Sequence, residues 1–321
     1  MNASQAVVLT PVYNDWKSLA QLLRELDRVL DEAGISVNIV AVDDGSTETP
    51  NEIEGLISEL RRVTGVRIIR LTRNLGHQKA IAVGLAALAS GPAVPVLIMD
   101  SDGEDRPEDA VRLLAEHARQ PDRVVFARRA RRSEGGLFRA CYAFYRLFFR
   151  LLTGTTIAFG NFSLVPPSLL RRVAYLPEIW NHFAAGVLRS GLPRCHLPTD
   201  RGARYAGRSR MNFIGLVVHG LSAISVYLDI AAVRMIILAC GVIGLVVAGF
   251  AALVYVRFFT TLAIPGWATT VGIGLVVILF QAILLLTALS FLVLNARSNK
   301  LFIPAKDYQD FVLETRTLGR P

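Results

Sequence analysis

Short apolar runs and amphipathic segments follow one another along the first 127 residues. Five apolar runs predict buried strands, at 6–11, 37–43, 66–72, 94–100 and 123–127. The polar–apolar spacing between them predicts three helices, at 16–34, 50–65 and 76–91. Apolar strands that alternate with helices are typical of a Rossmann-like α/β domain, in which helices cover both faces of a mostly parallel sheet.

The last third of the chain has a different pattern. Residues 235–256 carry no charge, and residues 258–296 carry none either, with a Pro265-Gly266-Trp267 turn between two apolar segments. A helix of about 22 residues is about 33 Å long, which is the thickness of the hydrocarbon core of a bilayer. We therefore expect two transmembrane helices, at about 235–257 and 268–294.

Two further segments are candidates for helices in the membrane interface. In residues 137–152, aromatic side chains recur at helical spacing beside a basic edge, which fits either an interfacial helix or a core helix with a solvated edge. Residues 211–230 are apolar but are bracketed by Arg210 and Arg234. This bracketing favours one or two helices lying in the interface over a third span.

Charge, cysteine content and the placement of basic residues indicate the class of protein, its compartment and its orientation in a membrane. The net charge is +9, from 35 basic and 26 acidic residues, and no nucleic-acid-binding motif is present. The three cysteines have no metal-binding or disulfide spacing, which favours a reducing compartment. Basic residues flank both ends of the apolar hairpin, whereas its loop carries only Arg257. The positive-inside rule then places both ends in the cytoplasm, and no signal-peptide pattern opens the sequence.

A cluster of acidic residues follows the fourth predicted strand. In "MDSDGEDRPED", Asp100, Asp102 and Glu104 alternate directly after the apolar run. In an extended segment these three side chains project to the same side, where they repel one another unless a cation lies between them. Carboxylate oxygens select Mg²⁺ or Mn²⁺, which commonly bridge to phosphates. We expect a metal site at Asp100, Asp102 and Glu104.

A second acidic pair ends the second predicted strand. "VDDGS" places Asp43 and Asp44 before a glycine turn, and the turn alone does not explain two adjacent acids at that position. Ligands of parallel α/β sheets bind at the carboxyl ends of the strands. The sequence has neither the glycine fingerprint of a dinucleotide site nor a P-loop, so phosphates would be neutralised in another way.

Together the motifs "TPVYN" (10–14), "VDDGS" (42–46), "RNLGHQKA" (73–80) and "MDSDGEDRPED" (99–109) resemble the family-two inverting glycosyltransferases. With two C-terminal spans, the sequence is most similar to the branch that glycosylates polyprenyl phosphates, which includes dolichol-phosphate mannose synthases and bactoprenol glucosyltransferases. The resemblance covers nearly the whole chain, and implies an α/β nucleotide-sugar-binding domain.

The resemblance implies roles for individual residues. Asp100, Asp102 and Glu104 would bind Mg²⁺ or Mn²⁺ and the donor diphosphate. The donor nucleotide would lie against ten positions, namely Pro11, Tyr13, Asn14, Asp43, Asp44, Asn74, Gly76, Lys79, Asp100 and Ser101. The acceptor phosphate would lie against five, namely Arg128, Arg132, Arg204, Ser209 and Arg210. For Arg128 and Arg132 a solvated charge run is the alternative interpretation.

One departure from the family concerns the general base. Relatives often carry an acidic residue where "GNFSLV" has Asn161. A phosphate monoester has a second pKa of about 6 and is mostly ionised at neutral pH, so it can attack without a base. Asn161 would then orient the acceptor, with Asp100 and Asp102 as the other catalytic residues.

The expected enzyme transfers a sugar from a nucleotide-sugar, with a UDP-sugar as first choice, to a polyprenyl phosphate in the inner or plasma membrane. The expected domains are a cytoplasmic transferase domain (1–210), interfacial helices (211–234), a transmembrane hairpin (235–296) and a cytoplasmic tail (297–321). The resemblance also implies a homo-oligomer. The alternatives are a transferase similar to polysaccharide synthases and a non-catalytic membrane scaffold built on this fold.

Overall fold

The computed structural model describes residues 6–129, 136–156, 159–205, 213–262, 264, 266–298 and 300–319. The described chain forms two compact units. One contains the residues up to 139, residues 157–226 and the residues from 301 onward, and the other contains residues 140–156 and 227–300.

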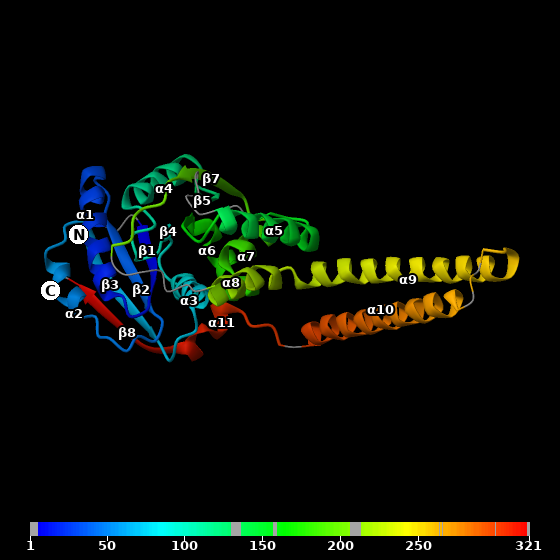
Figure 1. The fold of residues 1–321 in the computed structure, drawn as a ribbon. Helices are drawn as coiled ribbons and strands as arrows, with labels where there is room; N and C mark the ends of the chain where they lie inside the picture. The colour runs from blue at the N-terminus through cyan, green and yellow to red at the C-terminus, as the bar shows by residue number, and fades with distance from the viewer. Residues whose placement is uncertain are drawn as a thin grey trace. The chain divides into compact units, whose positions relative to one another are not determined.

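The first unit is built on a mixed, mostly parallel sheet (Figure 1). Its strands are β1 (Ala6–Val12), β2 (Val37–Asp43), β3 (Val63–Leu71), β4 (Val96–Ile98), β5 (Val124–Arg129), β6 (Ser163–Val165), β7 (Arg194–Thr199) and β8 (Val312–Gly319). They lie in the order β7-β5-β6-β4-β1-β2-β3-β8. β1, β2, β3 and β4 are parallel, as are β5 and β7, whereas β6 and β8 run antiparallel to their neighbours. The α/β fold predicted from the sequence is confirmed.

Helices cover both faces of this sheet. One buried cluster joins the sheet to α1 (Trp16–Ala33) and α4 (Pro107–Arg119). The other joins it to α3 (His77–Leu88), α6 (Pro167–Ala174) and α7 (Phe183–Arg189). Because the strands are apolar on both faces, each face needs such a cover. The shorter elements are α2 (Asn51–Glu54), η1 (Leu56–Ser58), η2 (Pro177–Trp180), α8 (Phe213–Ser225), α11 (Pro304–Asp307) and η3 (Tyr308–Phe311).

The helix predicted over residues 50–65 is wrong. The structure has only α2 and the single 3₁₀ turn η1 there, and β3 already begins at Val63. Asp27 of α1 accepts hydrogen bonds from the backbone N–H groups of Arg61, Arg62 and Val63 at 2.6–3.0 Å. These bonds hold the segment extended, because N–H groups that point to a side chain are not available to a helix.

The sequence pattern did not reveal the last strand. β8 lies beyond the two long apolar segments and pairs antiparallel with β3, from Gly65 opposite Gly319 to Leu71 opposite Val312. Figure 1 shows it beside β3. The predicted tail 297–321 therefore supplies an edge of the first unit's sheet. β6 and β7 were also not predicted, since β6 has only three residues and β7 contains a proline.

The second unit consists of most of α5 (Gly136–Thr153) together with α9 (Leu228–Phe259) and α10 (Trp267–Ser298). α9 and α10 pack against each other, and both are long and apolar enough to cross a membrane. Only 11% and 6% of their most apolar windows are buried, unlike core helices of soluble proteins. The two predicted apolar helices are confirmed, with α9 starting earlier than expected. The ambiguous segment 211–230 contributes α8, whose 13 residues are too few for a span.

Candidate active site

The parallel strands β1, β2 and β4 end at one edge of the sheet, where ligands of α/β folds bind. The loops after these strands carry the motifs "TPVYN", "VDDGS" and the acidic turn, which we define as residues Asp100–Asp105. The structure thus brings together residues that lie almost 100 positions apart in the sequence.

The loop after β2 is fixed by Asp44. Its carboxylate is 4% exposed and accepts hydrogen bonds from the N–H groups of Leu75 and Gly76, at 2.7 and 2.9 Å. Burial raises the pKa of Asp44, and the two backbone hydrogen bonds partly offset this rise. Gly45 packs against the same loop, because a Cβ there would lie 2.6 Å from the carbonyl carbon of Arg73. Asp44 is therefore an anchor that joins two loops.

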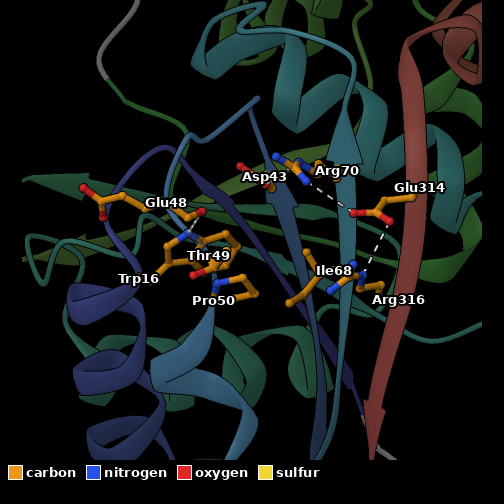
Figure 2. A pocket seen from close by; sticks show the side chains of 9 residues that line it. All are labelled: Trp16, Asp43, Glu48, Thr49, Pro50, Ile68, Arg70, Glu314 and Arg316. Atoms are coloured by element: carbon orange, nitrogen blue, oxygen red, sulfur yellow. Dashed lines mark hydrogen bonds and ion pairs between the residues drawn. The ribbon is translucent and has the colours of Figure 1, made fainter.

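Asp43 and Asn14 organise the neighbouring turn. Asp43 accepts a hydrogen bond from the N–H of Ser46 at 2.8 Å, and Asn14 accepts one from the N–H of Thr47 at 2.8 Å. Beside Asp43 lies a cavity of about 80 Å³, lined by both apolar and charged side chains. Figure 2 shows these side chains. The residues lining the cavity are Trp16, Asp43, Glu48, Thr49, Pro50, Ile68, Arg70, Glu314 and Arg316.

The acidic turn is not extended, contrary to the prediction from its sequence. Gly103 has a φ of 89°, and Oδ1 of Asp102 accepts the N–H of Glu104 at 2.9 Å, so the chain reverses within the turn. A Cβ at Gly103 would lie 2.8 Å from the carbonyl oxygen of Ala203. The carboxylates of Asp102 and Glu104 nevertheless lie close together, because both contact the same positively charged group.

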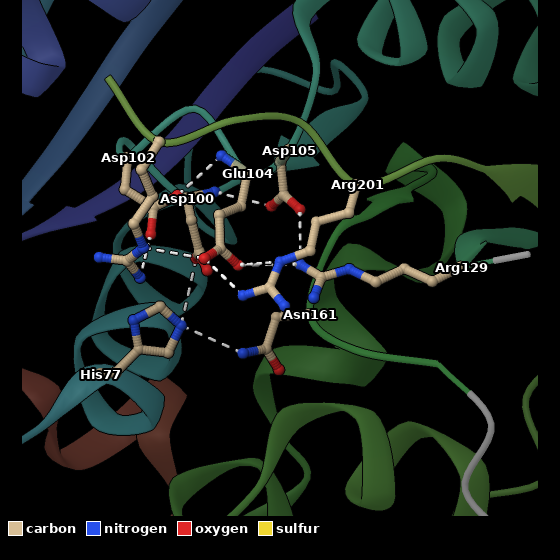
Figure 3. Close-up of polar contacts among 9 residues, drawn as sticks. His77, Asp100, Asp102, Glu104, Asp105, Arg129, Asn161 and Arg201 are labelled. Atoms are coloured by element: carbon tan, nitrogen blue, oxygen red, sulfur yellow. Dashed lines mark hydrogen bonds and ion pairs between the residues drawn. The ribbon is translucent and has the colours of Figure 1, made fainter. Parts of the chain in front are cut away.

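This shared partner is the guanidinium group of Arg204. Figure 3 shows the acidic turn with the neighbouring Arg201, His77 and Asn161. Nη2 of Arg204 lies 2.6 Å from Oδ2 of Asp102, and its Nε donates to Oε1 of Glu104 at 2.8 Å. Arg201 binds Glu104 with two further hydrogen bonds, at 2.6 and 3.0 Å. Burial alone raises the pKa of Glu104, but the hydrogen bonds from Arg201 and Arg204 outweigh burial and lower it.

The partly exposed Asp100 and the buried Asp105 are neighbours that share a backbone-to-side-chain hydrogen bond. Asp105 is 5% exposed, accepts the N–H of Asp100 at 3.0 Å, and lies 3.7 Å from Arg129. Burial raises the pKa of both carboxyls, and the negative charges of nearby acids raise them further. The two acids therefore resist being ionised together without an additional positive charge.

His77 links Asp100 to Asn161. Oδ1 of Asp100 is buried and accepts no hydrogen bond from the described residues, although it lies 3.3 Å from Nε2 of His77. The same Nε2 lies 3.1 Å from Nδ2 of Asn161. With Asn161 donating, the lone pair of Nε2 is used, and Asp100 then faces a nitrogen without a proton. An acid oxygen in this position needs a proton or a cation.

The donor set at the turn fits a hard divalent cation. Asp102 and Glu104 converge on one positive group, and the buried Oδ1 of Asp100 has no hydrogen-bond donor among the described residues. Oxygens of this kind are preferred ligands of Mg²⁺ and Mn²⁺. As the side chains stand among the described residues, no three Asp, Glu, His or Cys groups are arranged around a common ion position. Guanidinium groups hold the acids instead.

The remaining predicted residues are spread over the same edge of the sheet. Pro11 is buried within β1, and Ser101 is buried in the acidic turn. Tyr13 is 40% exposed. Asn74 is exposed. Gly76, the residue just before α3, has a φ of 96°. Within α3, Nζ of Lys79 lies 5.5 Å from the centre of the Trp180 ring. Arg128 is exposed on β5. Arg132, Ser209 and Arg210 lie outside the described residues.

Four residues at the site were not among the predicted site residues, namely His77, Asp105, Arg129 and Arg201. Asp105 has a sequence signal, since it continues the acidic cluster. Arg129 adjoins Arg128, and Arg201 lies just before the predicted Arg204. His77 lies in the motif "RNLGHQKA", but the sequence does not show its contacts with Asp100 and Asn161, which are distant in the chain.

The comparison with protein families decides the assignment. The model described as "Glycosyl transferase family 2" matches residues 7–180, which is more than half of the chain and includes both acidic strand ends. The chain belongs to glycosyl transferase family 2. The resemblance inferred from the four motifs is thereby confirmed, and family membership makes this chain a glycosyltransferase.

Curated relatives include members named for their acceptor. The chain is 28% identical to the uncharacterized glycosyltransferase YkcC of Bacillus subtilis over 88% of its length and 85% of that protein. It is 26% identical to the undecaprenyl-phosphate 4-deoxy-4-formamido-L-arabinose transferase of Enterobacter sp., over 65% of this chain and 63% of that enzyme. The polyprenyl-phosphate branch named from the sequence is thus represented among the relatives.

Solved structures include similar folds. A crystal structure of glucosyl-3-phosphoglycerate synthase from Mycobacterium tuberculosis, in complex with Mn²⁺, UDP-glucose and phosphoglyceric acid, has a TM-score of 0.48 and 16% identity. The match covers 71% of this chain and 80% of that one.

Proposed function

We propose that this glycosyltransferase moves a sugar from a nucleotide-sugar, with a UDP-sugar as the leading donor, to the phosphate of a membrane polyprenyl phosphate. The observation that carries the proposal is the convergence of Asp102 and Glu104 on one cationic group at the end of β4. A cation held there would face the donor diphosphate. The two long apolar helices and the relatives that act on undecaprenyl phosphate support a lipid acceptor.

The donor nucleotide would lie over the ends of β1 and β2. The cavity beside Asp43 offers apolar side chains for the base and a carboxylate oxygen for a base or ribose donor group. Pro11 and Tyr13 would form the wall from β1. Asp44 and Gly45 act indirectly in this proposal, because they hold the loop 73–76 against the site.

The acidic turn would bind Mg²⁺ or Mn²⁺ through Asp102 and Glu104, with Asp100 behind them. A bound dication supplies Lewis-acid stabilisation of the charge that develops on the leaving diphosphate. The chain's own contribution is to hold the carboxylates together and to surround them with the positive charges of Arg129 and Arg201. These charges lower the repulsion between neighbouring acids.

The acceptor phosphate would attack the anomeric carbon from the face opposite the diphosphate. The bond from the phosphate oxygen to the anomeric carbon forms while the bond from that carbon to the diphosphate breaks, which inverts the centre and releases the nucleoside diphosphate. The ionised phosphate has no proton to lose, so no acidic residue is needed where Asn161 stands. Asn161, held by His77, would orient the acceptor, and Arg128 and Arg204 would attract it.

The proposal places the enzyme in the inner or plasma membrane, with α9 and α10 as two spans and the catalytic unit in the cytoplasm. The arginines that flank the apolar hairpin support this orientation. It retains 1–210 as the transferase domain and 211–234 as interfacial helices, and adds that residues 312–319 return to the sheet. A homo-oligomer remains part of the proposal.

The test is a donor panel with the purified full chain. The protein is incubated in detergent with undecaprenyl phosphate, Mn²⁺ and, one at a time, UDP- and GDP-linked sugars, and lipid products are identified by mass spectrometry. The proposal predicts one glycolipid whose mass is that of the lipid phosphate plus one sugar. A polymer in place of the glycolipid would indicate a polysaccharide synthase, and donor binding without any product would indicate a scaffold. Either outcome contradicts the proposal.

A further inference from the structure

Arg204 stands between the two carboxylates to which the cation is assigned. Its Nη2 contacts Asp102 at 2.6 Å and its Nε contacts Glu104 at 2.8 Å, so one guanidinium group bridges both acids. A dication bound by the same oxygens would have to occupy the space of this group. The positions of Arg204 and of a bound cation therefore exclude each other, since like charges at contact distance repel strongly.

The backbone on either side of Arg204 is fixed independently of its side chain. The N–H of Gly202 donates to the carbonyl oxygen of Glu104, and the N–H of Tyr205 donates to that of Asp102, both at 2.9 Å. Tyr205 also donates from its hydroxyl to Glu25 at 2.9 Å. Gly202 lies so close to the turn that a Cβ there would meet the carbonyl oxygen of Gly103. We define residues 201–205 as the strap.

The strap lets the Arg204 side chain leave without unfolding the site. The two backbone hydrogen bonds do not involve the guanidinium group. Among the polar contacts within the described part of the chain, rotation of the side chain therefore breaks those with Asp102 and Glu104 and leaves the backbone bonds in place. Glu104 then keeps its two hydrogen bonds with Arg201. The change that frees the cation position is thus a single side-chain rearrangement.

We propose that Arg204 occupies the cation position until a divalent cation displaces it, and that the released guanidinium group then binds the acceptor phosphate. This inference rests on the proposed function for the identity of the acceptor. It assigns Arg204 two successive partners, first the acidic turn and then the lipid phosphate. Because the second partner requires the loss of the first, the acceptor binds well only after the donor and its cation, which protects the donor site from premature acceptor binding.

Arg201 provides a control of matched charge. Its two hydrogen bonds to the acidic turn both go to Glu104, whereas Arg204 bridges Glu104 and Asp102. Removal of either arginine deletes one positive charge beside Glu104. If the arginines affect cation binding only through their charge, the two substitutions should change the cation affinity by similar amounts. If Arg204 exchanges with the cation, its substitution should change the affinity more.

The first experiment measures Mn²⁺ binding to the full chain in detergent, without donor or acceptor, by the loss of the free-ion electron paramagnetic resonance signal. If Arg204 blocks the site in about nine of ten molecules, Arg204→Ala raises the Mn²⁺ affinity about tenfold, since the competent fraction limits the apparent affinity. Arg201→Ala should raise it clearly less. Equal effects of the two substitutions, or no rise for Arg204→Ala, would overturn the exchange. Arg204→Gln, which keeps the length of the side chain, provides a second variant if the alanine protein does not fold.

The second experiment measures binding of undecaprenyl phosphate with and without Mn²⁺ and UDP. The exchange predicts that Mn²⁺ and UDP together raise the lipid affinity of the wild-type chain and that Arg204→Ala removes this coupling. A coupling that survives in Arg204→Ala would overturn the second role. The Mn²⁺ experiment involves no turnover, so the absence of a glycolipid in the donor panel refutes the proposed function without affecting this result.

Discussion

Two strands of the sheet end in acidic residues, and their carboxylates are satisfied in different ways. After β2, both oxygens of Asp44 accept backbone N–H groups of the loop 73–76, and Asp43 accepts the N–H of Ser46. After β4, the carboxylates of Asp102 and Glu104 are held by the side chains of arginines, and Oδ1 of Asp100 accepts no hydrogen bond from the described residues.

This difference in hydrogen-bond partners indicates different roles. The acids after β2 hold a loop in place, whereas the acids after β4 can exchange their partners. A backbone N–H cannot leave without a rearrangement of the chain, and an unpaired buried group costs about 1–3 kcal/mol. A half-exposed arginine can rotate away and be hydrated. Similar sequences, "VDDGS" and "MDSDGED", thus give a rigid anchor at the end of β2 and, in our proposal, an exchangeable cation position at the end of β4.

The largest effect is expected on activity at the acidic turn. Asp102→Asn removes one of the two converging charges, so glycolipid formation should fall by about 10³-fold, the scale seen when a single group that stabilises the transition state is lost. The melting temperature should change little, because the amide oxygen still accepts the N–H of Glu104. Rates of glycolipid formation measure this. Glu108→Gln, an exposed acid on α4, should stay within about twofold, and an equal loss there would contradict the assignment.

The next effect is expected on stability at the other strand end. Asp44→Ala leaves the N–H groups of Leu75 and Gly76 without a partner, which should lower the free energy of unfolding by about 2–4 kcal/mol. Asp44→Asn keeps one acceptor oxygen and should lose less. Thermal melting of the two variants checks the order. Wild-type stability with lost activity in Asp44→Ala would show that Asp44 contacts a substrate instead of anchoring the loop.

A smaller effect is expected at Asp105, which is buried next to Asp100. The pKa of Asp105 is raised in the folded chain, so its contribution to stability is present at low pH and is lost as the pH rises through that raised pKa. Without added cation, the wild-type chain should lose stability between about pH 5 and pH 8, on the order of 1 kcal/mol, and Asp105→Asn should flatten this dependence. Melting curves at both pH values measure it. If Asp105→Asn lost more stability than the wild-type chain between these pH values, the pKa of Asp105 would not be raised and the interpretation would be refuted.

The smallest effect is expected at Glu314 of β8. It lies 3.5 Å from Arg70, which in turn lies 3.6 Å from Asp43, and both members of the Glu314–Arg70 pair are partly exposed. Glu314→Gln should change the free energy of unfolding by less than about 1 kcal/mol, as is usual for such pairs. Chemical denaturation measures this change. A larger loss would mean that the C-terminal strand stabilises the nucleotide side of the site through its charge.

The sequence predicted the central strands and the positions of both acidic ends because apolar runs and their terminating acids are local signals. It did not predict β8, whose partner β3 lies about 250 residues earlier in the chain. It was wrong about residues 50–65, where Asp27 on another helix captures the backbone. The acidic turn was also predicted to be extended, whereas the chain reverses at Gly103.

Within the site, sequence reasoning found the acids and not their partners. Arg204 was predicted as a ligand of the acceptor phosphate, but its contact with Asp102 depends on the strap, whose backbone binds the turn about 100 residues earlier in the chain. His77 was likewise joined to Asn161 only by folding. Such long-range contacts have no periodicity or spacing that a single sequence shows.

The most direct test of the account is the metal dependence of glycolipid formation by the purified wild-type chain. The reaction is followed in excess chelator, after addition of Mn²⁺, and after a return to chelator. We expect no product in chelator, recovery with Mn²⁺ and loss again on its removal. Formation of the glycolipid at an unchanged rate in chelator would contradict the assignment of a cation to Asp100, Asp102 and Glu104.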